Sequence, residues 1–152
     1  MLNLLNLILE TNEGTNSGNI TIEDGADGDI SFTNNGAGNI VFNDAAYNPE
    51  TGLTDAATIT WDAQAMPITK VTLTDNRILA APSNGAAGQF ISLLIIQDAT
   101  GSRTLTWNAV FEFPLEAAPT LTTTAALGDL FVFRYHNSKW LQVGATLALT
   151  VA

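Results

Sequence analysis

A ten-residue phrase near the N-terminus occurs three times and constrains the fold more than any other feature of the chain. Gly18, Gly28 and Gly38 each precede Asn or Asp and then Ile, in GNITI, GDISF and GNIVF. Apolar and polar residues alternate within each phrase, which is typical of a strand, and the Asp, Asn and Gly residues between phrases are typical of turns. The repeat therefore predicts three short strands, arranged as solenoid rungs or as a tight meander.

Each repeat supplies only two large apolar side chains, which are too few to form a core within one chain. We therefore expect threefold association of identical chains, in which these side chains meet on a common axis. Residues 16–56 are predicted to form a decapeptide-repeat β stalk that ends in a linker. The predicted oligomer interface consists of Ile20, Ile22, Ile30, Phe32, Ile40 and Phe42.

The N-terminal segment MLNLLNLILE is apolar whether it is helical or extended, and needs burial against something. It lacks the basic region and the cleavage site of a signal peptide, and it is too short to span a bilayer. Its own domain, sister subunits or a separate partner could cover it. We predict that residues 1–15 are a docking segment, whose partner-docking residues are Leu2, Leu4, Leu5, Leu7, Ile8 and Leu9.

The charge of the chain is concentrated in its first half. Residues 1–69 carry ten acids and no Lys or Arg, whereas residues 70–152 carry five acids and five bases. Because phosphate backbones are repelled by the first half and find no basic cluster in the second, nucleic acid is not an expected partner. The acidic half is interpreted either as a solvated surface or as a surface that attracts a basic partner or cations.

The close spacing of Asp24, Asp27 and Asp29 offers an alternative use of the repeats, as a calcium site. Glycine-rich calcium repeats have a period of nine, however, and the aspartates do not recur in the third phrase. Without cysteine, disulfides and zinc-thiolate sites are excluded. No metal or other cofactor is therefore predicted, and calcium remains an alternative.

Beyond residue 57 the chain consists of short apolar segments separated by turn residues. None has a helical period over ten residues, so the fold is predicted to be all-β. About eight strands with turns every eight to twelve residues predict a jelly-roll-like β-sandwich over residues 57–152. The expected strands cover residues 57–61, 67–74, 77–81, 89–97, 103–107, 110–113, 129–135 and 140–143, and a last strand closes the chain.

Two of these strands, 89–97 and 129–135, are apolar on both faces. A two-layer sandwich leaves one face of each sheet in water, so these strands need either a central position or a subunit interface. Turn residues predict a tight hairpin at 98–102 and another at the HNSK sequence, 136–139. Trp107 and Trp140 are expected in the core.

Residues 85–145 contain a series of short motifs in a fixed order. A hydrophobic strand that ends in Gln-Asp is followed by a Thr-Gly turn and by Arg-Thr-x-Thr-Trp, at 97–98, 100–101 and 103–107. Pro-x-Leu, an Asp before a hydrophobic strand and a late Trp come next, at 119–121, 129 and 140. In these motifs residues 85–145 resemble a module of bacteriophage virion proteins. The module is shared by capsid decoration (cement), head-fibre and tail-fibre or spike proteins, and the resemblance implies a structural virion protein.

Catalysis is not expected. His136 is the sole histidine and lies in a predicted hairpin turn, and no GxSxG nucleophile context occurs. Carboxylate pairs of the kind that glycosidases use are available, but the predicted fold leaves little room for a long cleft. We therefore predict a protein that is not an enzyme.

The resemblance and the repeats together predict a homotrimeric capsid decoration protein on the virion surface, at the capsid exterior. Its expected partners are copies of itself and the phage major capsid protein, on which it would dock to stabilise the shell; no membrane partner is expected. One alternative is the receptor-binding tip of a tail fibre or spike, which would recognise a host surface glycan. Another is a carbohydrate-binding module with Trp61 or Tyr47 as a stacking platform.

Overall fold

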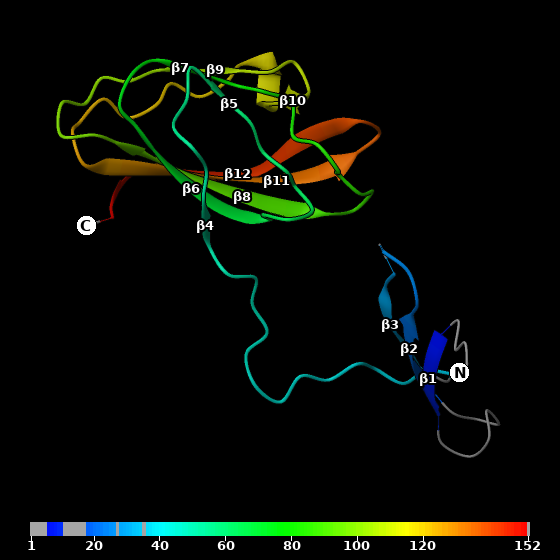
Figure 1. Ribbon diagram of the computed structural model, residues 1–152. Helices are drawn as coiled ribbons and strands as arrows, with labels where there is room; N and C mark the ends of the chain where they lie inside the picture. The colour runs from blue at the N-terminus through cyan, green and yellow to red at the C-terminus, as the bar shows by residue number, and fades with distance from the viewer. Residues whose placement is uncertain (1–5, 11–17, 27, 35, 152) are drawn as a thin grey trace. The chain divides into compact units, whose positions relative to one another are not determined.

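The computed structural model describes residues 6–10, 18–26, 28–34 and 36–151, in two compact units, Met1–Ala46 and Tyr47–Ala152 (Figure 1). The regular elements of the described residues are β-strands apart from one 3-10 turn, η2 (Pro114–Glu116). The prediction of an all-β protein is confirmed. None of the described residues belongs to a helix with the length and apolarity that crossing a membrane requires.

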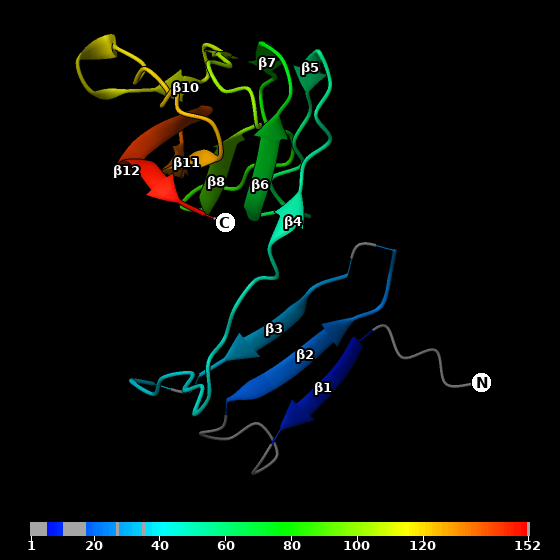
Figure 2. The ribbon, with the colours of Figure 1, turned by 90° about the vertical axis from the view of Figure 1, so that its left-hand side faces the viewer.

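The first unit contains a three-stranded antiparallel sheet in the order β1-β2-β3 (Figure 2). Its strands are β1 (Asn6–Glu10), β2 (Asn19–Glu23) and β3 (Ile30–Thr33). The first two repeats therefore pair as neighbours of a meander and not as parallel rungs. The third repeat forms no strand in the described part of the chain, so the expectation of a third strand there is wrong for the single chain. An alternating pattern favours an extended conformation, but a strand also needs a neighbour for its backbone groups.

The second unit contains two sheets, one of six strands and one of three (Figure 1). The larger sheet has the order β10-β12-β11-β8-β6-β4 and the smaller has the order β5-β7-β9. The strands are β4 (Thr51–Gly52), β5 (Thr58–Ile59), β6 (Ile68–Leu73), β7 (Arg77–Leu79), β8 (Phe90–Gln97), β9 (Leu105–Trp107), β10 (Phe111–Glu112), β11 (Leu127–His136) and β12 (Lys139–Thr150).

From β4 to β9 the chain alternates between the two sheets and winds through three coils. Each coil places one strand in the larger sheet and the next in the smaller one, in the pairs β4–β5, β6–β7 and β8–β9. Strands of successive coils pair in parallel in both sheets. A jelly roll is built from antiparallel strands, so the expected jelly-roll connectivity is wrong for this part of the domain. The alternation in sequence specifies the face of each residue and leaves the direction of pairing open.

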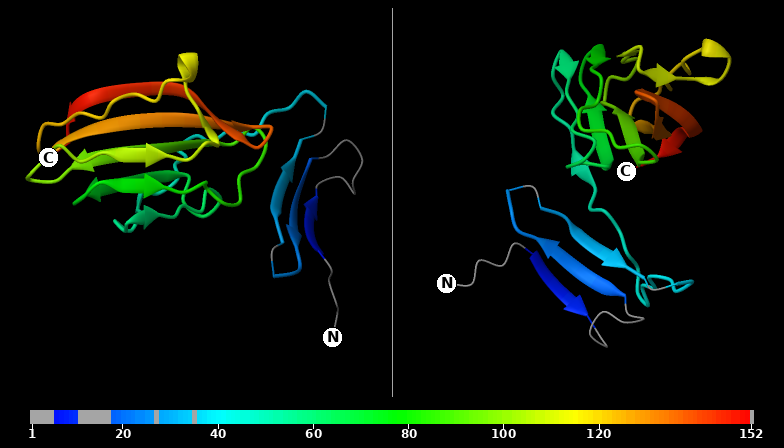
Figure 3. Two further views of the ribbon diagram at one scale, coloured as in Figure 1. Left: turned by 90° about the horizontal axis from the view of Figure 1, so that it is seen from above. Right: turned by 90° about the vertical axis from the view of Figure 1, so that its right-hand side faces the viewer.

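The last two strands form the hairpin that the HNSK turn predicts. β11 pairs antiparallel with β12, and His136 lies opposite Lys139. Asn137 and Ser138 have φ of 48° and 62°, which fits a type I′ two-residue turn. The view from above in Figure 3 shows this hairpin alongside the green strands of the same sheet. The hairpin prediction is confirmed.

The core of the second unit lies between its two sheets, as in a sandwich. Ile59 and Leu79 of the smaller sheet are fully buried against Leu73, Leu93 and other residues of the larger one. Trp140 is 1% exposed, and the half-buried Trp107 packs on the same core. The ring of Trp107 contacts four phenylalanine rings with centroids between 5.0 and 5.7 Å away, those of Phe111, Phe113, Phe131 and Phe133.

The second unit begins before residue 57, where the sequence predicted its start. Residues 47–56, expected in the linker, contain β4 and the buried Leu53. The amide of Leu53 donates to the carbonyl of Lys70, at 2.8 Å, and ties this segment to β6. A two-residue strand is too short to leave a period in the sequence, which explains the error.

The two doubly apolar strands take the central positions that burial requires. β8 lies between β11 and β6, and β11 lies between β12 and β8. Their inward side chains are buried, whereas Leu94 and Ile96 of β8 and Leu130 and Val132 of β11 are half-buried on the outer face. A central position therefore accounts for one face of these strands, and the other remains partly open to solvent.

Candidate functional site

The apolar residues of the first two repeats gather on one face of the N-terminal sheet. Ile20 lies opposite Phe32, and Ile22 lies opposite Ile30. Directly opposed residues of antiparallel strands project to the same side, so these four side chains share a face, which we call the repeat face. Ile22, Ile30 and Phe32 are 39%, 61% and 51% exposed. Four of the six predicted interface residues are thus together, and in a single chain they are only partly covered.

The other two predicted interface residues belong to the third repeat, which is extended but outside any sheet. Ile40 is 46% exposed and Phe42 is 67% exposed, and Val41 between them is 72% exposed. Three consecutive large apolar residues are therefore open to solvent. Exposed apolar clusters of this kind mark association surfaces.

The predicted docking segment contributes β1 to the same sheet. The register places Leu7 opposite Ile22 and Leu9 opposite Ile20, and it places Ile8 opposite Thr21. The further predicted docking residues Leu2, Leu4 and Leu5 lie outside the described residues.

Two of the three aspartates considered for calcium belong to the described residues. Asp24 and Asp29 are exposed, and Asp27 lies outside the described part of the chain. Among the described residues no group of three or more His, Cys, Asp or Glu side chains could hold a metal ion.

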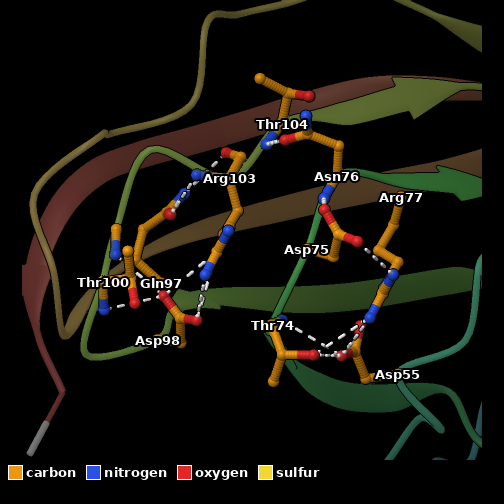
Figure 4. Close-up of polar contacts among 11 residues, drawn as sticks. Asp55, Thr74, Asp75, Asn76, Arg77, Gln97, Asp98, Thr100, Arg103 and Thr104 are labelled. Atoms are coloured by element: carbon orange, nitrogen blue, oxygen red, sulfur yellow. Dashed lines mark hydrogen bonds and ion pairs between the residues drawn. The ribbon is translucent and has the colours of Figure 1, made fainter.

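The motif that carries the phage resemblance builds a turn between β8 and β9. Gln97 is 2% exposed; its amide nitrogen donates to the Arg103 carbonyl at 2.9 Å, and its oxygen accepts from the Arg103 amide at 2.8 Å. Asp98 accepts from the amides of Thr100 and Gly101, at 3.0 and 2.8 Å, and pairs with the Arg103 guanidinium at 2.8 Å (Figure 4). That ion pair lowers the pKa of Asp98 through its hydrogen bond with Arg103. Since β8 and β9 belong to different sheets, the turn at 98–102 crosses between sheets and is not the hairpin that we expected.

Gly101 in this turn has a geometric requirement. Its φ is +75°, and a Cβ there would lie 2.5 Å from the carbonyl oxygen of Thr123. Only glycine fits such a position without moving the neighbouring backbone. The Gln-Asp, Thr-Gly and Arg elements are therefore explained by the turn itself.

Polar side chains also join successive coils at one end of the stack (Figure 4). Asp55 of the first coil accepts from Arg77 Nε at 2.7 Å and from the Thr74 amide at 3.1 Å, both in the second coil. Asn76 of the second coil accepts from the amide of Thr104 in the third at 2.9 Å. The hydrogen bond from Arg77 holds the pKa of Asp55 well below its ordinary value of 3.8.

The sequence contains a signal for these coil contacts that we did not use. β6 and β8 both end in a short polar stretch with Asp followed by Arg, in LTDNR at 73–77 and in QDATGSR at 97–103. Recurrence of such a stretch after two buried strands indicates repeated coils. Its spacing is irregular, which hid it beside the strict period of the first unit.

The expected stacking platforms for sugar differ from each other in exposure. Trp61 is 2% exposed, and its indole nitrogen donates to the Met66 carbonyl at 2.7 Å. It offers no open face, so the expectation for Trp61 is wrong. Tyr47 is 82% exposed. His136, considered for catalysis, is exposed beside the hairpin turn, as the sequence predicted.

Comparison of the chain with protein-family models, with curated proteins and with solved structures finds no match.

Proposed function

We propose that this chain is a structural component of a bacteriophage virion, a homotrimeric decoration protein that docks on the major capsid protein and stabilises the shell from the capsid exterior. The observation that carries the proposal is the repeat face of the N-terminal sheet. Its strand residues are aligned on one side and remain partly exposed in a single chain. Burial of apolar surface is favourable by about 25 cal/mol per Å², so such a face favours association.

The division of the chain supports the same proposal. The second unit surrounds a closed core of its own, whereas the described strands of the first unit form one three-stranded sheet and no second layer. A single layer cannot bury its apolar face, and association supplies the missing layer. We therefore assign assembly to the repeat stalk of the first unit, and we assign to the second unit the surface module that its sequence resembles.

The charge of the first unit supports docking on a basic surface. Glu23, Asp24, Asp29 and Asp44 are exposed, and no Lys or Arg occurs before residue 70. Four of the five basic residues, Lys70, Arg77, Arg103 and Lys139, form ion pairs with acids of the second unit. A shell that presents basic groups would complement these acids and speed encounter with the decoration protein.

The native mass of the purified protein, measured by light scattering through a dilution series, tests this proposal. We expect a mass near three chains, and we expect Phe32→Asp to reduce it to one chain because the trimer would bury an unpaired charge. The control Thr33→Asp changes an exposed position next to it in β3, on the opposite side of the strand, and should leave the mass unchanged. A single-chain mass at every concentration would contradict the trimer.

Docking is tested separately, by cosedimentation with purified empty shells assembled from a phage major capsid protein. We expect the full chain to sediment with the shells, and a variant that lacks residues 1–14 to stay in solution with its second unit folded. Equal cosedimentation of both proteins would contradict a docking role for the N-terminal segment.

A second candidate function is the glycan-binding tip of a tail fibre or spike. One observation favours it: an open surface cleft of about 290 Å³ that is lined by Thr60, Trp61, Asp62, Met66, Ala81 and Ser83. Hydroxyl and carboxylate groups suit the hydrogen-bonding pattern of sugars. Selective signal on a glycan array that Asp62→Asn removes would favour this function over capsid decoration.

A further inference from the structure

We infer that the third repeat, residues 38–42, adds as a strand to the free edge of β3 in a second copy of the chain. The inference rests on the proposed trimer and deepens it, because it names the segment that each copy donates and the edge that receives it. Three copies that donate in a ring would pair every donor segment and every acceptor edge.

The donor segment, residues 38–42, has the sequence pattern of a strand but forms no strand in the described part of the chain. GNIVF repeats the pattern of GNITI and GDISF, which form β2 and the start of β3. In the described part of the chain, residues 38–42 take part in no ladder, and Ile40, Val41 and Phe42 are exposed. A strand-like segment that exposes its apolar side chains and pairs with no described strand is suited to pairing with a further strand.

The acceptor is the outer edge of β3. In the order β1-β2-β3, one side of β3 pairs with β2, and no described strand pairs with the other side. Extended segments bind such edges through backbone hydrogen bonds, and their alternate side chains supply specificity. Neither β3 nor residues 38–42 contain a charged residue, so the acids of the first unit impose no direct charge repulsion within this contact.

The register between residues 38–42 and β3 of the second copy follows from the register between β2 and β3. In β2 and β3, the first apolar residue of one phrase lies opposite the second of the next: Ile20 faces Phe32 and Ile22 faces Ile30. The same rule places Ile40 opposite Phe32 and Phe42 opposite Ile30. All six predicted interface residues then share the repeat face, and Val41 lies opposite Ser31 on the other side of the sheet.

A second copy is the occupant because no described residue of the same chain pairs with the outer edge of β3. The two stretches that separate the three phrases, 23–27 and 33–37, are both five residues long. The chain turns in the second stretch, with Gly36 at φ +63°. Asn34 Nδ2 donates to the carbonyl of Gly38 at 2.8 Å across this turn. Although the edge of β3 is thus within reach of the next phrase, that phrase pairs with no strand among the described residues. A second copy would pair with the donor segment and with the acceptor edge at once.

Disulfide trapping tests the inference, because the chain has no cysteine of its own. The single variants S31C and V41C are unfolded, mixed in equal amounts, refolded and oxidised. We expect a covalent heterodimer that contains one chain of each variant, identified by the mass of the linked peptides. We expect the double variant S31C/V41C to form covalent dimers and trimers on a non-reducing gel.

The matched control replaces Ser31 by a residue of the neighbouring strand. Thr21 lies opposite Ser31 and is half-buried like it, but it belongs to β2, one strand further from the edge. A mixture of T21C and V41C should give little heterodimer. Each single variant alone measures the background of symmetric linkage, and the near-ultraviolet circular dichroism of the tryptophans verifies that the second unit is folded.

The outcomes separate this inference from the proposed function. An intramolecular link in the double variant, or no excess of the S31C–V41C heterodimer over the control, overturns strand donation. If the wild-type mass is nevertheless three chains, the trimer stands and is held by another contact. If the wild-type mass is one chain, the trimer fails together with the inference.

Discussion

Large apolar residues of the same kinds have opposite surroundings in the two units. Ile59, Leu73 and Phe133 of the second unit are completely buried, whereas Ile30 and Phe32 of the first are 61% and 51% exposed. Both units use alternating strands, so the difference lies in the layers. The second unit folds two sheets onto each other within one chain, and the described strands of the first form one sheet. The comparison shows that the second unit encloses its own core, whereas the described strands of the first leave an apolar face partly exposed.

The second unit achieves its two layers through its coils. Each passage from β4 to β5, from β6 to β7 and from β8 to β9 carries the chain from one sheet to the other. A coil therefore covers its own inner face, and the next coil extends both sheets together. The described strands of the first unit form a meander in one layer. A further strand added to this sheet would enlarge its apolar face without covering it.

The largest expected effect comes from truncating a phenylalanine in each unit. We expect Phe133→Ala to lower the free energy of unfolding of the second unit by about 3–5 kcal/mol, because it leaves a cavity in a closed core. Phe32→Ala should change that free energy by less than about 0.5 kcal/mol, as surface substitutions do, while it weakens assembly. Denaturant unfolding followed by tryptophan fluorescence measures the first effect, and light scattering measures the second. Equal losses of stability from the two variants would remove the distinction between the units.

A smaller effect is expected at the contact between the first two coils. Asp55→Asn replaces the carboxylate that accepts from Arg77 and Thr74, and we expect a loss of about 1–2 kcal/mol from the second unit. The control is Asp75→Asn, because the Asp75 carboxylate is 67% exposed and lies 3.6 Å from Arg77. A control that costs as much as Asp55→Asn would show that the coil contact is not the cause.

The same carboxylate predicts a pH dependence. The folded pKa of Asp55 is lower than its ordinary value of 3.8, so on acidification the unfolded chain takes up the proton first. The stabilisation is therefore present above about pH 4 and is lost as the pH falls toward the folded pKa. We expect the unfolding free energy of Asp55→Asn to decline less steeply than that of the wild type below pH 4. Identical slopes would contradict this assignment.

The smallest effect is expected at the β11–β12 turn. Ser138 has φ of 62°, a conformation that costs a residue with a Cβ more than it costs glycine. We expect Ser138→Gly to stabilise the second unit by about 0.5 kcal/mol, visible as a higher denaturant midpoint with an unchanged slope. Asn137→Gly should gain less, since asparagine tolerates this conformation. A lower midpoint for Ser138→Gly would show that the turn has a different requirement.

Much of the second unit was predictable because its signals are local. The alternation of Phe131, Phe133 and Tyr135 predicts the inner face of β11, and the structure confirms it. The turn residues at 136–139 predict the hairpin that follows. The sequence did not predict that residues 47–56 belong to the second unit. The two residues of β4 and the single buried Leu53 are too few to form a periodic pattern.

In the first unit, the local sequence pattern predicts which face each residue of the candidate site occupies, but not which segments pair. The repeat correctly places Ile20, Ile22, Ile30 and Phe32 on one face, since period two depends only on the chain itself. It does not distinguish the two phrases that pair from the third, which is equally strand-like and forms no strand in the single chain.

The sequence by itself determined which segments are extended, which face of each is apolar and where the chain turns. Only the tertiary structure decided that successive coils pair in parallel, that residues 47–56 join the second unit and that the third repeat pairs with no described strand. The physical reason is that the alternation of a strand is visible in its side chains, whereas strand pairing depends on backbone hydrogen bonds. The backbone groups that form these bonds are nearly the same at every residue, so the sequence does not specify the partner strand.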